Sequence, residues 1–320
     1  MSDAGNVVAN HRMVEVGAAV PGLAGCRVAA DIFVPASGPR EPVVFCCLPG
    51  GAMSRGYWDL RPTGDDTYSF ALWMAGAGFP VICVDHLGTG GSVLPVGAQA
   101  PLLEQVVAAN DAAFRTLLHE LGGHDPLRQW RSVGVGHSMG AMMTVRQQAA
   151  YTTYDAVALL GFGLDGLPSA LSPEVLAACA DGIPDDEHLA ELALGMFGAA
   201  YPGRSREPTA GATLHGGSSA AVKGALAAAR TVLLGAGGLL SMLPGNVAVD
   251  AVRLRVPVLV MNGERDSLID GRQTQARQYH HAPSFATHVL PDMGHNQNVA
   301  PTRHELWDEL RRWAESAVAG

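Results

Sequence analysis

Short apolar runs alternate with segments of helical spacing along the first half of the chain. The apolar runs cover residues 43–48, 81–84, 132–135 and 156–160. The intervening segments repeat apolar residues every three or four positions, over 68–76, 102–121 and 140–150. A run that is apolar on both faces favours a strand covered by helices on both sides. The alternation therefore predicts an α/β protein with a mostly parallel sheet and right-handed crossovers.

The same pattern returns near the end of the chain. Two further apolar runs, 256–261 and 285–290, predict strands, and a segment of helical spacing over 302–318 predicts the last helix. Before the first central run, residues 27–34 are the best candidate for an antiparallel strand at the edge of the sheet.

The middle of the chain lacks strand-like runs. Its helical patterns cover 173–179, 186–197 and 219–234, and the whole stretch is too long for a plain loop. We expect a helical insertion that forms a cap, or lid, over the sheet. The expected organisation is an α/β core over 1–162, a helical cap over 163–249 and the rest of the core over 250–320.

Composition narrows the class of protein. Apolar residues make up 48% of the 320 residues, which is enough for a sizeable core. The net charge of −9 and the aromatic content of 6% argue against a nucleic-acid partner, which would call for a basic face or stacking platforms.

Membrane and metal partners are not expected either. Residues 231–249 carry no charge, but glycines and Pro244 interrupt the apolar run, so no stable membrane span is predicted. A lid that lies at a membrane interface is kept as an alternative. The start of the chain lacks a signal-peptide pattern. The five cysteines have no metal-ligand spacing, which indicates reduced, buried thiols in a cytoplasmic protein.

A Gly-x-Ser-x-Gly motif follows the predicted strand 132–135 and precedes a predicted helix. It reads Gly136-His137-Ser138-Met139-Gly140, and this context is that of a nucleophile elbow. We expect Ser138 to be the nucleophile and the N–H of Met139 to face developing negative charge. The alternative is a glycine-rich turn with a bystander serine.

A serine hydroxyl needs an adjacent base. His295 follows the last apolar strand and precedes the last helix, where a loop reaches back over the sheet. We predict that it is the general base. His137 is expected to point elsewhere on its turn, and His280 and His281 to be exposed.

The base needs an acid that orients it. Asp266 comes just after the strand at 256–261, and the order Ser, Asp, His is that of this motif's usual fold. The rivals are Glu264 and Asp270 on the same loop and Asp165 after an earlier strand.

The residues around these three predict the remainder of a site. The N–H of Gly51, after the strand at 43–48, is our choice for the second oxyanion donor, with a glycine-rich turn as the alternative. Met53, Trp58 and His137 are pocket candidates, with core packing as the alternative. Apolar residues of the middle segment suggest a hydrophobic pocket: Met196, Phe197, Leu233, Leu234 and Met242.

These motifs together resemble the α/β-hydrolase superfamily in its capped, esterase-like branch. The resemblance covers about residues 25–162 and 250–318, and it rests on segments 48–51, 85–92, 136–140, 263–266 and 294–295. It implies an eight-stranded, mostly parallel sheet, a helical cap between the sixth and seventh strands, and no cofactor. Pro49 departs from the His-Gly that the family often has there. Ser138 disfavours activities like those of haloalkane dehalogenases or epoxide hydrolases, which use aspartate.

The sequence thus predicts a serine hydrolase that cleaves a small-molecule carboxylic ester with an apolar group, through an acyl-enzyme. Lactone, thioester or carbon–carbon bond hydrolysis and acyl transfer use the same triad and stay open, as does the oligomeric state. A lipase-like enzyme at a membrane surface and a non-catalytic binding protein are the further alternatives.

Overall fold

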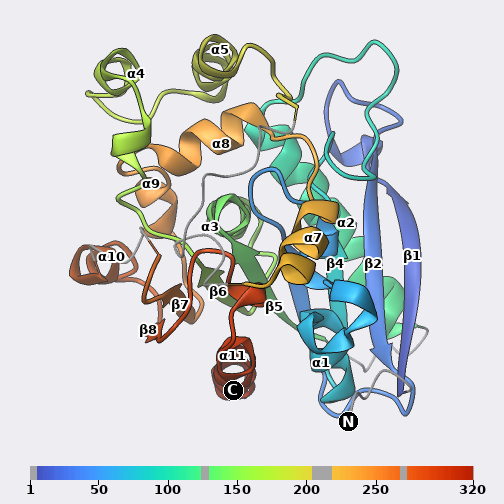
Figure 1. Cartoon of the computed structure of the whole chain (residues 1–320). Helices are drawn as coiled ribbons and strands as arrows, with labels where there is room; N and C mark the ends of the chain where they lie inside the picture. The colour runs from blue at the N-terminus through green and yellow to red at the C-terminus, as the bar shows by residue number, and fades with distance from the viewer. Residues whose placement is uncertain (1–5, 124–129, 204–217, 267–271, 320) are drawn as a thin grey trace.

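The structure, a computed structural model, describes residues 6–123, 130–203, 218–266 and 272–319. Its centre is one eight-stranded sheet with the order β1-β2-β4-β3-β5-β6-β7-β8 (Figure 1). Both pairings of β2 are antiparallel and the other pairings are parallel. The predicted α/β class and mostly parallel eight-stranded sheet are confirmed. The strands are β1 Val7–Glu15, β2 Arg27–Pro35, β3 Val43–Leu48, β4 Val81–Val84, β5 Arg131–His137, β6 Ala156–Leu160, β7 Val258–Gly263 and β8 Phe285–Leu290.

The central strands are covered on both faces, as their apolar runs require. In β3 the side chains of Val44, Cys46 and Leu48 join one buried cluster, and those of Val43, Phe45 and Cys47 join the other. Helices α2 (Leu103–Gly122) and α3 (Met139–Tyr151) cover the first face, and α1 (Phe70–Gly76) and α11 (Arg303–Ala317) cover the second.

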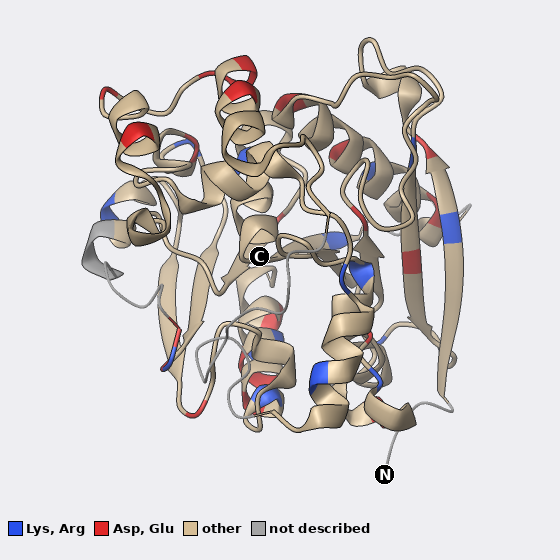
Figure 2. Ribbon diagram, turned by 45° about the horizontal axis from the view of Figure 1, so that its top comes forward, with Lys and Arg blue, Asp and Glu red and all other residues tan. Residues whose placement is uncertain are grey.

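Charge follows the same division. Strands β3, β4, β6 and β7 carry no charged residue. Figure 2 places the charged positions on the helices, the connecting loops and the outer strands. Burial of charge without a partner is costly, so the distribution agrees with a sheet enclosed on both sides.

Between β6 and β7 the chain runs through a helical region, which we call the insertion. In Figure 1 its helices α4, α5 and α8 form the upper part of the molecule, above α3. The described helices of the insertion are α4 Pro173–Ala178, α5 Asp186–Phe197, α7 Ala220–Ala228, α8 Gly235–Met242 and α9 Ala248–Ala251. After β7, the short helix α10 (Arg272–Gln278) leads to β8.

Three details differ from the sequence-based expectations. The helix predicted over 219–234 ends at Ala228, and an extended segment precedes α8. A second antiparallel strand, β1, lies at the edge of the sheet; the region before Pro35 was expected to add such strands, but only the bounds of the one at 27–34 were predicted. Four cysteines are buried as expected, but Cys179 is only partly buried. Among the described residues, no helix is long and apolar enough to cross a membrane.

Candidate active site

Ser138 occupies a sharp turn between β5 and α3. Its φ of 54° and ψ of −121° lie in a sparsely populated region, which costs about 1–3 kcal/mol for a residue other than glycine. A Cβ on Gly136 would lie 2.4 Å from the oxygen of Gly140, and one on Gly140 would lie 2.3 Å from the oxygen of Leu48. Only glycine fits at both positions, so the motif is required by the geometry of the turn.

The three predicted catalytic residues lie in one hydrogen-bonded row. His295 Nε2 is 3.0 Å from Ser138 Oγ, and His295 Nδ1 is 3.0 Å from Asp266 Oδ2. The Asp266 side chain is fully buried, whereas that of His295 is 18% exposed. Because the carboxylate accepts a bond from Nδ1–H, Nε2 keeps its lone pair for the serine O–H.

The loops after β7 and β8 bring the acid and the base together. A Cβ on Gly263 would lie 2.2 Å from the oxygen of Met293, so only glycine allows this close approach. The N–H of Arg265 donates to the same Met293 oxygen at 2.9 Å, and that of Asp266 donates to Gly263 at 3.0 Å. The two loops therefore act as one unit that positions Asp266 against His295.

The rival residues lie elsewhere. Glu264 accepts a bond from the N–H of Asp292 near the surface, and Asp165 is exposed. Asp270 lies outside the described residues. His280 and His281 are exposed after the end of α10, as expected.

His137 lies beneath the elbow and is buried. Its Nε2–H donates to the backbone oxygen of His295 at 2.8 Å, and its ring stacks on Tyr57 with centroids 4.6 Å apart. Burial, together with the nearby His295, lowers the pKa of His137 to about 3. The ring is therefore neutral at ordinary pH and connects the elbow to the backbone of the base.

Gly161, directly after β6, lies against the His295–Asp266 pair and was not among the predicted site residues. Its φ is +56°, and a Cβ there would lie 3.2 Å from His295 Nδ1 and 3.3 Å from Asp266 Oδ2. A side chain would therefore press on the pair. The only sequence signal for this role was a glycine immediately after a predicted strand.

The two candidate oxyanion donors lie side by side. A Cβ on Gly51 would be 3.8 Å from Met139 Cβ. Within the described part of the chain, neither N–H has a hydrogen-bond acceptor. The oxygen of Gly50 accepts from the N–H of Met53 at 3.1 Å, and because a trans peptide is planar, the N–H of Gly51 points the opposite way. Met139 is the first residue of α3, where an N–H has no partner within the helix.

A buried histidine supports the loop that carries Gly51. His86 Nε2–H donates to the oxygen of Pro49 at 3.0 Å, and its Nδ1 accepts from Asn110 at 3.2 Å. Burial lowers the pKa of His86, so it stays neutral and keeps this tautomer. His86 belongs to the segment 85–92 that carries part of the family resemblance, and no role was predicted for it.

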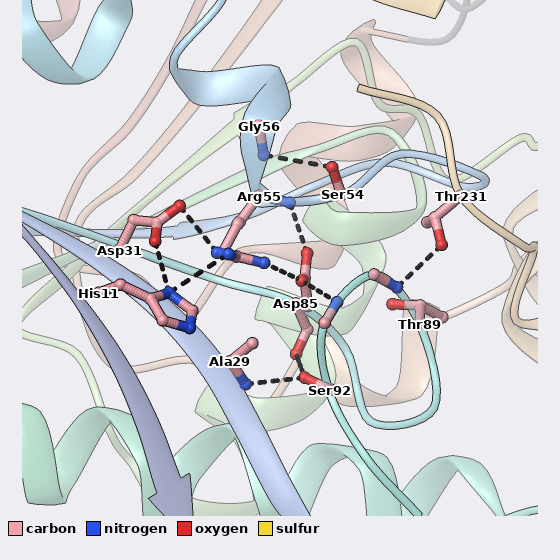
Figure 3. A network of polar contacts seen from close by, with 12 residues as sticks. His11, Ala29, Asp31, Ser54, Arg55, Gly56, Asp85, Thr89, Ser92 and Thr231 are labelled. Carbon is pink, nitrogen blue, oxygen red and sulfur yellow. Dashed lines mark hydrogen bonds and ion pairs between the residues drawn. The ribbon is translucent and has the colours of Figure 1, made fainter. Parts of the chain in front are cut away.

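A polar network holds the other end of the same loop (Figure 3). Asp85 accepts from the backbone N–H of Arg55 at 2.6 Å and pairs with its guanidinium at 2.5 Å. The guanidinium also pairs with Asp31 at 2.7 Å. Asp85 further accepts from the N–H of Gly91 at 2.7 Å. A Cβ on Gly90 would overlap the Asp85 carboxylate, which explains the glycine at this position.

The pocket candidates occupy different positions. Trp58 is fully buried and packs on Phe70 with ring centroids 5.2 Å apart, so the core-packing alternative describes its place. Met53 is partly buried and pairs with Arg230 of the insertion. Leu233 contacts the loop that carries Gly51, since its Cδ1 is 3.0 Å from the Cβ position of Gly51.

The other apolar residues of the insertion divide by exposure. Leu234 is buried, Phe197 and Met242 pack partly buried against the core cluster, and Met196 is 37% exposed. Among the described residues, no group of three or more His, Cys, Asp or Glu side chains is arranged to hold a metal ion. That no cofactor takes part stays a prediction.

The fold is also that of solved hydrolases. The monoacylglycerol lipase of Paleococcus ferrophilus superposes with a TM-score of 0.60 at 18% identity, covering 91% of this chain and 99% of the other. An esterase of Thermogutta terrifontis gives 0.59 at 16% identity, with 96% and 99% covered. The peroxisomal alpha-beta-hydrolase Lpx1 of Saccharomyces cerevisiae gives 0.59 at 14% identity, with 98% and 89% covered.

The sequence itself identifies the family. Residues 43–308 match the profile of the Alpha/beta hydrolase family. Comparison with curated protein sequences gives no match. The protein is thus a hydrolase of the α/β-hydrolase type, and the chain belongs to the Alpha/beta hydrolase family.

Proposed function

We propose that the protein is a serine hydrolase that cleaves carboxylic esters, with Ser138 as nucleophile, His295 as base and Asp266 as the orienting acid. The observation that carries the proposal is the row of two 3.0 Å contacts that joins Ser138, His295 and Asp266 on a strained elbow. Ser138 and His295 are partly exposed and the carboxylate at the other end is fully buried, which suits proton transfer toward a bound substrate.

The mechanism is acyl transfer through an acyl-enzyme. His295 takes the proton of the Ser138 hydroxyl as Oγ attacks the ester carbonyl. The N–H groups of Gly51 and Met139 hold the resulting oxyanion, and one such donor contributes about 3 kcal/mol of transition-state stabilisation. Collapse expels the alkoxide, which receives the proton from His295, and water repeats the steps to release the acid.

The substrate class is an ester with an apolar acyl or alcohol group. Leu233 and Met139 are apolar and lie against Gly51, and the insertion, which we propose acts as a cap, adds further apolar side chains. Lactones, thioesters, carbon–carbon bonds and acyl transfer would use the same three residues. A panel of p-nitrophenyl esters from acetate to octanoate, with a matched thioester and lactone, separates these chemistries. A preference for acetate over all longer chains would contradict the apolar pocket.

The decisive experiment is labelling with a fluorophosphonate followed by peptide mass spectrometry. We expect the label on Ser138, with loss of labelling and a fall in kcat of about 10⁴-fold or more in Ser138→Ala. Ser316→Ala, which removes an exposed hydroxyl on α11, is the matched control and should keep both. Full esterase activity in Ser138→Ala would disprove the proposal.

A further inference from the structure

The segment that follows α7 is bonded to the loop that carries Gly51. We call residues 229–233 the return segment. The oxygen of Ala229 accepts from the N–H of Ser54 at 2.8 Å and from its hydroxyl at 2.9 Å. The N–H of Thr231 donates to the oxygen of Ala52 at 2.9 Å. The two backbone bonds make a single antiparallel bridge between Met53 and Arg230.

Side chains of the return segment also contact the loop that carries Gly51 and its surroundings. Leu233 lies between two glycines: its Cδ1 is 3.0 Å from the Cβ position of Gly51, and its Cδ2 is 2.9 Å from that of Gly238 in α8. Thr231 Oγ1 accepts from the N–H of Gly90 at 2.8 Å, which ties the segment to the neighbouring glycine loop (Figure 3). The segment therefore joins two loops of the core and one helix of the insertion.

The turn that aims Gly51 is strained. Its four residues run from Gly50 to Met53 and are closed by the bond between these two. Ala52, the third residue, has a φ of +58°. A positive φ at this position is the type II pattern, in which glycine is preferred because a Cβ is disfavoured there. The turn thus needs support from outside, and the Ala52 oxygen receives it from Thr231.

No other part of the described chain forms a hydrogen bond to this turn from outside its own loop. His86 fixes the loop at Pro49, and Asp85 fixes it at Arg55. Between these anchors, every hydrogen bond that residues 51–54 make outside their own loop, within the described chain, goes to the return segment. The strained turn lies in this stretch.

We propose that the return segment is a positioning element of the oxyanion site, which holds the Ala52 turn so that the Gly51 N–H faces the reacting carbonyl. The proposal rests on the serine hydrolase function proposed above. It makes assembly of the oxyanion site depend on the position of the insertion: a shift of the return segment away from Ala52 releases the turn and redirects the donor.

The test removes the N–H that Thr231 donates to Ala52. Thr231→Pro deletes this donor, and we expect kcat to fall about 10- to 100-fold with little change in KM, because a misplaced donor affects mainly the transition state. The affinity for a trifluoromethyl ketone, which forms an oxyanion on the serine, should fall by a similar factor. The same substitution also removes Oγ1, which accepts from the N–H of Gly90, so Thr231→Val, which loses this oxygen but keeps the N–H, is measured beside it and should keep most of the wild-type kcat. Val249→Pro is the matched control, since this exposed residue lies in the first turn of α9, where proline is tolerated.

A second variant separates positioning from general damage. Ala52→Gly relieves the strain in the turn, so the double variant Ala52→Gly/Thr231→Pro should regain part of the lost kcat. Hydrogen exchange in peptides covering residues 49–58 should be faster in Thr231→Pro than in the wild type, and unchanged in Val249→Pro.

Two results would overturn the proposal. One is a folded Thr231→Pro with wild-type kcat, ketone affinity and exchange. The other is a loss of activity that Ala52→Gly does not restore and that comes with a lower Tm but unchanged exchange over 49–58. If the wild type neither labels at Ser138 nor cleaves esters, the proposed function fails, while the exchange comparison still decides whether the segment holds the turn.

Discussion

The two halves of the candidate site are built in different ways. The proton-transfer half consists of Ser138, Asp266 and His295, which follow β5, β7 and β8 and contact one another through short core loops. The oxyanion half depends on Gly51, whose loop is bonded to the insertion. The first half is positioned by the order of strands in the sheet. The second needs a segment that is distant in sequence and lies outside the sheet.

The difference shows in how each half is stabilised. In the proton-transfer half, glycines at 136, 140, 161 and 263 permit close backbone contacts that leave few alternative arrangements. In the oxyanion half, an alanine adopts a conformation that suits glycine, and external hydrogen bonds maintain it. We therefore expect activity to fall when the catalytic groups of the first half are substituted, and when contacts that pack against the second half are removed.

The largest expected effect lies in the proton-transfer half. Asp266→Asn keeps the size of the side chain but favours the wrong tautomer of His295, so kcat should fall about 10⁴-fold. Steady-state ester hydrolysis and the rate of fluorophosphonate labelling measure it. Asp165→Asn, at the exposed rival position, should leave both unchanged. Loss of activity in Asp165→Asn, with full activity in Asp266→Asn, would instead identify Asp165 as the orienting acid.

His137→Phe should have a smaller effect in the same half. It keeps the stacking on Tyr57 but removes the donor to the His295 oxygen, and leaving a buried carbonyl without its partner costs about 1–3 kcal/mol. We expect this cost to displace the backbone and ring of His295, so kcat should fall about 10-fold. His137→Gln, which retains a donor, should recover part of the rate. Equal rates in Phe and Gln variants would show that the bond does not position His295.

Leu233→Ala tests the packing of the oxyanion half. The change frees space directly over Gly51, and removing apolar contact is worth about 1–3 kcal/mol at a pocket. We expect the preferred acyl chain to lengthen or branch, with a several-fold change in kcat/KM across a p-nitrophenyl ester series. An unchanged profile would place Leu233 outside the substrate pocket.

The smallest effect near neutral pH is on stability. The pKa of His137 is lowered to about 3 by burial, so the unfolded chain binds a proton that the native protein does not bind, once pH falls below the ordinary value near 6.5. Stability should therefore decrease from about pH 6.5 towards 3, by at most about 1.4 kcal/mol per pH unit from this residue. Urea unfolding at pH 7, 6 and 5 measures the slope.

The same measurement on His137→Phe provides the comparison. This variant lacks the titrating group, so its stability should depend less steeply on pH over that window. His86, whose pKa burial also lowers, remains in both proteins and contributes equally. Identical slopes would mean that His137 is protonated in the native state or not buried.

Local patterns in the sequence were enough to predict the sheet and to select Ser138, Asp266 and His295, which the structure brings together. An apolar run such as Val43–Leu48 has no polar face, so it predicts a strand buried on both sides. Gly136 and Gly140 indicate a tight turn, because a Cβ at either position would clash with the backbone. Ser138, Asp266 and His295 each follow a strand of the parallel part of the sheet. Because the carboxyl ends of parallel strands lie at the same edge, the three residues are expected to lie close together. These features depend on short-range periodicity and local steric constraint, both of which can be recognised in the sequence alone.

Contacts between distant segments decided the rest. Helical spacing over 219–234 predicted a continuous helix, but the helix ends at Ala228. The oxygen of Ala229 and the N–H of Thr231 then bond to Ser54 and Ala52. Likewise, His137 points to the backbone of His295, and Arg55 pairs with Asp85, because strands and loops from other parts of the chain bring those groups within reach. Local preferences at such positions are nearly balanced, and the hydrogen bonds that settle them form only once the tertiary structure has assembled.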